Sequence, residues 1–414
     1  MAEEPISIHK YSNGLTLIAE PMAEVSSAGF VFLLAAGVAH DACGRTGSAN
    51  VLAEHLFRGA GEMDNRALNE RLDNLGLHRQ SSVSCLYTTL GGGLIADNLL
   101  EALRLHADVI RRPQLAADQF ETCQQLALQS LDSLKDDPRQ QVSLLVRERF
   151  LPYPFGRPTV GKREDLEQLT AAEVRCAYGE RFSPAGTVLA VAGRVDFEQI
   201  KAAVGEYFGD WEGSRPAEPE KGAVLSETYH QQNEGAQVHV GLMYPSVAQE
   251  DRGYYAALTA AGILSGGMGS RLFTEVREKR GLCYAVGASH RVVGGYGLVQ
   301  CYLGSSPEKA QEALDVMVGE LVKLAEGVSS EELERAKTGL RASLIMMGES
   351  SGARAAGCVR DYYYLGRVRP LEEIEAAIKA VSIEDVIEHV RAHAPQGFAV
   401  ATIGPKQLKT PVAG

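Results

Sequence analysis

The sequence predicts an α+β fold of two homologous domains, each a mixed, mainly antiparallel β-sheet covered by α-helices. Three observations lead to this prediction. Segments with strand-like and helix-like periodicity follow one another in the same order in both halves of the chain. Consecutive strand segments are joined by tight turns. Long helical segments alternate with these strands, which indicates helices packed on a sheet in each half.

The elements of the repeat can be matched one by one. In the first half, strands are expected at residues 14–19 and 29–36, an apolar helix at 49–58 and a further strand at 86–95. In the second half, a strand at 237–243, a helix at 254–264 and a strand at 296–303 follow in the same order.

The later parts of the two halves also correspond. Each half has a helix with the tripeptide Glu-Ala-Leu, at 101–103 and at 312–314, followed by a long helix with a capped start, at 116–134 and at 329–347. Each half then closes with a helix and a strand. These are 171–182 and 188–192 in the first half, and 383–393 and 398–403 in the second. Residues 211–226 are rich in proline, glycine and acids without an apolar period. We therefore expect domains at 1–210 and 227–414 with a linker at 211–226.

The charge balance excludes several classes of partner. The chain has 414 residues, with 41 Lys and Arg against 53 Asp and Glu, which gives a net charge of −12. Such a chain lacks the general basic field that binds nucleic acid or anionic lipid. Its longest apolar stretch, residues 28–39, is too short to cross a bilayer. We expect no nucleic-acid partner and no membrane partner.

Compartment and redox state follow from two further features. The first ten residues, MAEEPISIHK, resemble neither a secretory signal nor a transit peptide, which favours a cytoplasmic location. The seven cysteines are scattered and form no CxxC pair. We expect reduced core thiols rather than a disulfide framework or a zinc knuckle.

The pair Glu54–His55, on the apolar helix of the first half, invites a search for a metal site. A helical zinc site needs two ligands about one turn apart, as in the inverted motif HxxEH. The position of the first histidine is Val51, or Asn50 if one residue is inserted, and neither is a zinc ligand. One histidine cannot hold zinc, so we interpret Glu54 and His55 as a buried or partly buried hydrogen-bonded pair.

At this point the sequence resembles the pitrilysin-type metallopeptidases, which include the mitochondrial processing peptidase and the respiratory core proteins. The resemblance covers nearly the whole chain. It rests on four stretches: NVLAEHLFRGA at 50–60, KDDP at 135–138, LPYPFGRPTVGKREDLEQLT at 151–170, and the run at 182–211 with VAGRVD and YFGDW. The family implies two homologous α+β domains and a closed chamber that holds unfolded peptides.

The resemblance also locates the family's other metal-site positions. The third zinc ligand, a glutamate before the Asp-Asp-Pro turn, falls on Ser130, and a further acidic position falls on Cys123. The nearby carboxylate of Asp132 would point away from Ser130 on a helix. Glu54 and His55 are therefore vestigial, and we expect no metal on this chain and no activity from it alone, because a base without a Lewis acid and its water has nothing to activate.

A second candidate site lies in the second half. Lys279 and Arg280 in a last turn and Gly281 after it predict a helix end, with a strand from Leu282. The chain reversal could bring Arg277 and Tyr284 together as hydrogen-bond donors to a peptide carbonyl or oxyanion. The residues alone favour a solvated arginine and a core tyrosine. The resemblance instead implies substrate binding by this pair, on the domain that lacks zinc.

The resemblance thus implies a non-catalytic subunit that pairs with a zinc-bearing homologue and binds an unstructured peptide, with the zinc on the partner. A zinc peptidase acting alone with an altered site, and a structural subunit like the respiratory core proteins, stay open as alternatives, as does a homodimer of the isolated chain. Two weaker patterns are interpreted as structural. The glycine clusters at 91–93 and 266–269 are expected to form turns, and His389 and His393 are expected to lie at an exposed helix end.

Overall fold

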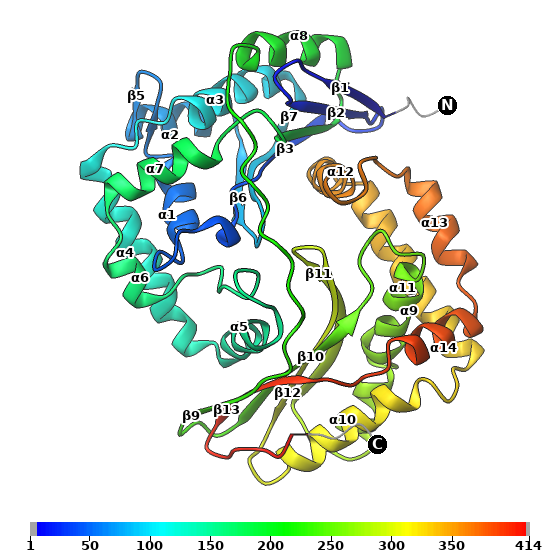
Figure 1. The fold of residues 1–414 in the computed structure, drawn as a ribbon. Coiled ribbons are helices and arrows are strands. Elements are labelled where there is room, and N and C mark those ends of the chain that lie inside the picture. The colour runs from blue at the N-terminus through cyan, green and yellow to red at the C-terminus, as the bar shows by residue number, and fades with distance from the viewer. Residues whose placement is uncertain (1–5, 411–414) are drawn as a thin grey trace. The chain divides into compact units, whose positions relative to one another are not determined.

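The computed structural model describes residues 6–410, which fold into two compact units that interleave along the chain (Figure 1). Unit 1 comprises the chain up to Asp132, Arg157–Glu220 and Met346–Pro370. Unit 2 comprises Ser133–Gly156, Lys221–Ile345 and the chain from Leu371 onward. Each unit therefore contains one segment that comes from the other half of the sequence.

Unit 1 is built on a six-stranded sheet of order β1-β2-β8-β3-β7-β6. Only the neighbours β2 and β8 are parallel among these strands, and the other pairs are antiparallel. The strands are β1 (Ser7–Lys10), β2 (Thr16–Pro21), β3 (Ser27–Leu34), β6 (His78–Val83), β7 (Thr88–Ile95) and β8 (Val188–Gly193), with a separate two-stranded ribbon of β4 (Gly59–Ala60) and β5 (Met63–Asp64).

Unit 2 repeats this topology. Its five-stranded sheet has the order β11-β12-β10-β13-β9, and β13 and β9 form its parallel pair. Read from the other edge, this is the order β2-β8-β3-β7-β6 of unit 1. The strands are β9 (Thr228–Gln232), β10 (Val238–Ser246), β11 (Ala285–Val293), β12 (Tyr296–Ser305) and β13 (Ala399–Gly404). The predicted fold class, two similar mixed sheets covered by helices, is confirmed.

Several helices cover one face of the unit 1 sheet and enclose its main core. This core includes Phe30, Phe32 and Leu90 from the sheet. The helices of unit 1 are α1 (Ser48–His55), α2 (Asn65–Asn74), α3 (Leu99–Arg111), α4 (Ala117–Ser133), α6 (Arg163–Glu167), α7 (Ala171–Arg181), α8 (Phe197–Phe208) and α12 (Ser351–Leu365), with 3-10 turns at Val38–His40 and Ala96–Asn98.

Helix α12 packs on the other face of the same sheet, against β3 and β8, although it comes from the second half of the sequence. The approach is close enough to require glycine, because a Cβ on Gly29 would lie 2.5 Å from the backbone nitrogen of Gly352. Arg354 of α12 donates three hydrogen bonds of 2.6–2.9 Å to the carboxylate of Glu20. This largely buried ion pair holds α12 on the sheet.

The sheet of unit 2 has an equivalent helix, α5 (Pro138–Phe150), which comes from the first half and packs on β10 and β13. Gly241 of β10 lies under it, 2.9 Å from Val146 if a Cβ is added. The other helices are α9 (Tyr254–Ser265), the π-helix η4 (Phe273–Glu278), α10 (Ala310–Lys323), α11 (Ser330–Gly348), α13 (Leu371–Ala380) and α14 (Ile383–Ala392), with a 3-10 turn at Leu134–Asp136.

Three further predictions can be compared with these elements. No helix or strand lies between Phe208 and Thr228, where the linker was expected. Residues 266–269 form the expected turn, but residues 91–93 do not, because they lie inside strand β7. Within the described residues, no helix is long and apolar enough to cross a membrane.

Candidate functional site

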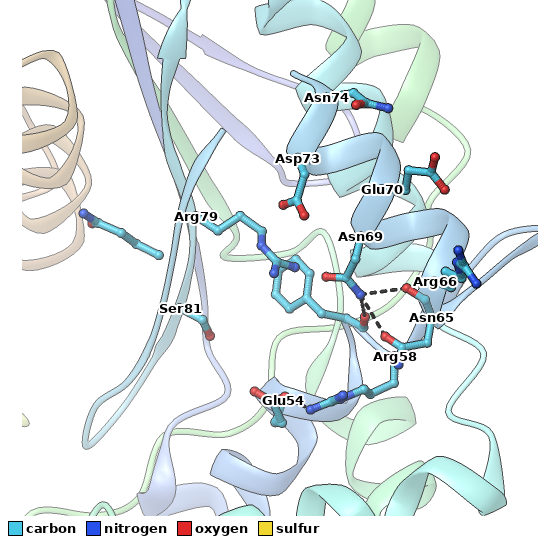
Figure 2. Close-up of a pocket in the computed structure, with 12 residues that line it drawn as sticks. Glu54, Arg58, Asn65, Arg66, Asn69, Glu70, Asp73, Asn74, Arg79 and Ser81 are labelled. Carbon is cyan, nitrogen blue, oxygen red and sulfur yellow. Dashed lines mark hydrogen bonds and ion pairs between the residues drawn. The ribbon is translucent and has the colours of Figure 1, made fainter. Parts of the chain in front are cut away.

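An open groove of about 770 Å³ lies in unit 1 between the end of α1, helix α2 and strand β6 (Figure 2). We call it the α1–α2 groove. Its lining is polar and carries both charges: Glu54, Phe57, Arg58, Asn65, Arg66, Asn69, Glu70, Asp73, Asn74, Arg79, Gln80 and Ser81. Strand β6, which contributes Arg79, Gln80 and Ser81 to this lining, is the last strand of its sheet and has one free edge.

The position of helix α1 is fixed by a buried carboxylate. Asp41 accepts hydrogen bonds from the backbone nitrogens of Gly47 and Ala49, at 2.8 and 3.1 Å, and from the Ser48 hydroxyl at 2.7 Å. Arg181 donates to the same carboxylate at 2.9 Å, and both side chains are almost fully buried. These bonds satisfy the first donors of the helix and place a negative charge at its positive end.

Two residues one turn apart on α1, Asn50 and Glu54, are engaged by neighbours in the chain. The side-chain amide of Asn50 donates to the carbonyl of Thr159. The carboxylate of Glu54 accepts a hydrogen bond from Arg58 and forms an ion pair with it. Glu54 therefore lies at the groove beside a fixed guanidinium, as Figure 2 shows.

The adjacent residue, His55, faces the interior instead. Its side chain is fully buried, as is that of Val51 one turn earlier. The Nε2–H of His55 donates to the carbonyl of Ala116 at 3.0 Å, and Nδ1 has no hydrogen-bond partner in the described structure. Burial lowers the pKa of His55 below its usual value, which keeps the ring neutral. Glu54 and His55 thus bond to different partners and do not form the hydrogen-bonded pair expected from the sequence.

The positions where the resemblance places the family's further acidic residues, Ser130 and Cys123, and the nearby Asp132 have other roles in the structure. Ser130 is exposed, and its hydroxyl donates to the carbonyl of Leu126 at 2.9 Å. Cys123 is buried, and burial raises the pKa of its thiol to about 11, against the opposing effect of Arg58 nearby. Asp132 accepts a hydrogen bond from Arg163 at 2.6 Å.

A zinc ion therefore does not fit these residues. Zinc needs three or four histidine, cysteine or carboxylate ligands that converge on one point. Nowhere in residues 6–410 do three such side chains gather in a metal-binding arrangement. Near α1, the candidate ligands are the amide of Asn50, which is bonded to Thr159, the carboxylate of Glu54, which is ion-paired with Arg58, and the single histidine His55, which faces the interior.

In unit 2, Arg277 and Tyr284 flank the predicted chain reversal. Gly281 has a left-handed φ of 57°, and its nitrogen donates to the carbonyl of Arg277 at 3.0 Å, so the predicted helix cap is confirmed. The helix end is a π-helix, η4, and strand β11 begins at Ala285, so Tyr284 precedes the strand instead of lying inside it.

Both side chains are exposed in the described structure, Tyr284 to 66%. Arg277 lies 5.0 Å above the ring of Phe273 in a cation–π contact. Burial raises the pKa of Cys283, the residue before Tyr284, and the positive charge of Arg277 has a smaller effect in the opposite direction. The residues alone had favoured a buried tyrosine, and this is wrong.

The histidine pair on α14 also differs from expectation. His389 and His393 are not on an exposed helix end, because their rings stack at 4.8 Å and both are half-buried. Burial lowers the pKa of His389 to about 4, with smaller effects from His393 and His290. Neither histidine belongs to a group of three possible metal ligands in the part of the chain that is described.

Sequence reasoning missed the edge strand of the groove. Residues 78–83 (HRQSSV) have no apolar alternation, and the three glycines of β7 beside them are typical of turns. It also missed the stacking of Arg79 on the ring of Phe57 at 5.1 Å, which forms one wall of the groove. The Arg-Gly pair at 58–59 was part of the quoted motif, but its arginine was not assigned a role.

Comparisons with known proteins agree with this architecture. Residues 15–162 match the family model "Insulinase (Peptidase family M16)", and residues 168–340 match "Peptidase M16 inactive domain". A Mycobacterium bovis protein named as an uncharacterized zinc protease is 27% identical over 406 residues, which are 96% of this chain and 92% of that protein. A Rickettsia bellii protein of the same description is 26% identical over 409 residues, 98% of this chain and 99% of that one.

Solved structures show the same fold. The crystal structure of a peptidase M16 inactive domain from Pseudomonas fluorescens has a TM-score of 0.87 at 21% identity and covers 99% of this chain and 100% of that one. A protease from Helicobacter pylori has a TM-score of 0.89 at 18% identity, with 97% and 100% covered. The two family models together span most of the sequence, and the groove described above lies within the residues matched by the first of them. The chain belongs to the peptidase M16 family.

Proposed function

We propose that this chain is the zinc-less subunit of a two-subunit M16-type peptidase. It pairs with a zinc-bearing homologue, completes the chamber in which unstructured peptides are degraded, and binds the peptide through Arg277 and Tyr284. The observation that carries this proposal is the state of helix α1. This helix offers an amide, Asn50, that is bonded to Thr159, and a carboxylate, Glu54, that is ion-paired at the α1–α2 groove, instead of a set of metal ligands.

The Glu54–Arg58 ion pair supports the absence of metal chemistry on this chain. A carboxylate acts as a general base when it can reach a water and accept its proton. Here the carboxylate of Glu54 is engaged by the guanidinium of Arg58, and the described residues bring no group of metal ligands beside it. In this proposal, zinc and the activated water belong to the partner subunit.

The free edge of β6 supports peptide binding by this chain. Its backbone donors and acceptors on the side away from β7 face no other strand within the sheet. An extended peptide can pair with such an edge and gain main-chain hydrogen bonds without regard to its sequence. This mode suits a subunit that handles unstructured peptides.

Arg277 and Tyr284 are assigned to the substrate because both are exposed donors on either side of a rigid turn. A guanidinium and a phenol can donate hydrogen bonds to a peptide carbonyl, and more strongly to the oxyanion that forms when it is attacked. The carbonyl of Arg277 accepts the hydrogen bond that closes the turn from the nitrogen of Gly281, and Tyr284 follows three residues later, so the two donors flank the same turn.

The test is reconstitution of activity by mixing this chain with a zinc-bearing M16 homologue. We expect the mixture to cleave an unstructured fluorogenic peptide, and Arg277→Ala and Tyr284→Phe to lower its kcat/KM by about tenfold or more each. Arg280→Ala is the matched control, since this exposed arginine is held by Glu275. Unchanged cleavage with both Arg277→Ala and Tyr284→Phe would refute the assigned role.

A peptidase that acts alone is the second candidate, because the relatives at 26–27% identity are named as zinc proteases. It predicts about one equivalent of zinc in the purified chain and digestion of the peptide without a partner. Metal analysis of the chain, purified without chelators, separates the two candidates.

A further inference from the structure

Strand β6 separates two hollows in unit 1. The α1–α2 groove lies on one side of the strand, and a second hollow of about 600 Å³ lies on the other. Gln80 of β6 contributes to the lining of both. We call the second one the glycine hollow, and its lining residues are Ser26, Ser27, Phe30, Val31, Gly76, His78, Gln80, Gly92, Gly93, Leu94, Ile95, Ser350, Ser351 and Gly352.

The side chains of β6 alternate between these two hollows. Ser81 pairs with Leu90 of β7, whose side chain lies in the core under the helices, so Ser81 and Arg79 face the α1–α2 groove (Figure 2). His78 and Gln80 face the opposite side of the sheet, toward the glycine hollow. A strand that pairs with the free edge of β6 must alternate in the same way.

The glycine hollow exists because β7 carries glycine where other strands carry side chains. A Cβ added to Gly93 would meet no atom closer than the carbonyl oxygen of Ala28, 3.9 Å away, so the space above it is open. Ile95, exposed to 62%, and Val31 provide aliphatic surface in the lining. The first residues of α12, from Ser350, bound the hollow. The aliphatic part of this lining favours an aliphatic side chain over a charged one, and the hollow has more room than one such side chain fills.

The α1–α2 groove offers a different environment next to the strand. Arg79 belongs to β6 itself and has no ion-pair partner within the described residues, and its guanidinium rests on Phe57. The carboxylates of Glu70 and Asp73 belong to helix α2, across the groove (Figure 2). Opposite charges favour each other when they face across neighbouring strands. The residue that pairs with Arg79 on an added strand is therefore favoured to be acidic.

We propose that this chain selects extended peptides in which aliphatic and acidic residues alternate. The aliphatic side chain occupies the glycine hollow, and the acidic side chains on either side of it face the α1–α2 groove at Arg79. This selection rests on the proposed function, since it requires that a peptide adds to the edge of β6. In this inference, the residues on the two faces of strand β6 determine which class of peptide is bound.

The experiment measures binding of short fluorescein-labelled peptides to the full-length chain by fluorescence anisotropy. One peptide alternates valine and glutamate between flexible flanks, and a second has the same composition with the valines and glutamates in separate blocks. We expect the alternating peptide to bind about tenfold more tightly, because burial of one valine contributes enough for that factor. Alternating peptides with alanine for valine, or lysine for glutamate, complete the set.

Two substitutions test the hollow and the groove separately. Gly93→Val narrows the glycine hollow at a strand position without a left-handed φ, and it should remove the preference for valine over alanine. Arg79→Glu should reverse the preference from glutamate to lysine peptides. Gly179→Ala, at an open position on α7, is the control, and thermal unfolding verifies that each variant is folded.

The outcomes distinguish this inference from the proposed function. If all peptides bind equally and Gly93→Val changes none of the affinities, the chain binds peptides without this selection, and the inference is overturned. If no peptide binds to the native chain, peptide binding at the β6 edge fails as well. Loss of the valine preference in Gly93→Val together with reversal in Arg79→Glu supports the inference.

Discussion

His106, in the middle of α3, should make the stability of unit 1 depend on pH. Its ring is fully buried between aromatic side chains, with the centroid of Phe30 at 4.8 Å and that of Phe57 at 5.9 Å. Its Nδ1–H donates to the carbonyl of Ala102 at 2.8 Å, and Nε2 has no hydrogen-bond partner in the described structure. Burial lowers the pKa of His106 to about 4.

The sign and size of the effect follow from this pKa. The ordinary pKa of 6.5 applies to the unfolded chain, so below that pH the unfolded state takes up a proton that the folded state refuses until pH is about 4. The free energy of unfolding is therefore highest above pH 6.5 and falls as pH decreases toward 4. The difference between the two pKa values corresponds to about 3 kcal/mol.

The perturbation that tests this is His106→Phe, which keeps a planar ring among its aromatic neighbours and removes the titrating group. Relative to the native chain, the variant should gain about 3 kcal/mol in unfolding free energy between pH 7 and pH 4. At pH 7 the variant loses the hydrogen bond to the carbonyl of Ala102, which is unfavourable, but it also loses the buried, unpartnered Nε2, which is favourable. Its unfolding free energy at pH 7 should therefore differ from that of the native chain by about 1 kcal/mol or less.

Urea unfolding followed by tryptophan fluorescence is the suitable assay. The chain has one tryptophan, and Trp211 lies in the main core of unit 1 against Phe208. Its emission therefore reports on the unit that contains His106. His9→Phe, on strand β1, is the control for loss of a histidine outside the core. A difference between native chain and His106→Phe that stays constant from pH 7 to pH 4 would refute the reasoning.

Three other measurements test the structure. Arg354→Met should lower the unfolding free energy of unit 1 by about 3–5 kcal/mol in the Trp211 assay, because it leaves the carboxylate of Glu20 unpaired, and Glu20→Gln added to it should restore most of the loss. Mass spectrometric metal analysis of the purified chain should find far less than one equivalent of zinc, and a full equivalent would contradict the ligand geometry. Gly281→Ala should lower stability by about 1 kcal/mol in thermal unfolding through its φ of 57° alone, whereas Gly281→Asn should cost less.

The order of elements could be predicted from the sequence because each half carries its own periodicity. The helix expected at 254–264 is α9, and the strand expected at 188–192 lies within β8. The duplication was visible for the same reason, since matching segments bury matching faces. The sheet orders agree strand for strand except for β1, which has no counterpart in unit 2.

The exchange of α5 and α12 between the halves could not be predicted in this way. An amphipathic pattern tells that a helix buries one face, but it does not tell which sheet receives it. The signals that could have indicated it are single glycines in strands, Gly29 and Gly241, where a helix approaches the backbone closely. The strand expected at 86–95 is β7, but the turn expected at 91–93 is not present, because pairing with β3 and β6 on both sides outweighs the low strand propensity of these glycines.

The candidate metal site shows how one residue of register changes its interpretation. If the motif is aligned on the dipeptide Glu54–His55, this chain retains the general base and one of the zinc ligands. The structure of helix α1 does not support this alignment. Val51 and His55 are buried on one face of the helix, whereas the side chains of Asn50 and Glu54 bond to Thr159 and Arg58 on another face. Aligning the motif on its end, 57–60, would place Asn50 and Glu54 one turn apart at the two helical ligand positions, with Arg58 bonded to the carboxylate. A histidine at position 50 would then still face an ion-paired carboxylate. The residues here therefore fail to fit zinc at three positions: the amide of Asn50, Glu54 with its contact to Arg58, and Ser130 at the position that the resemblance assigns to the third ligand.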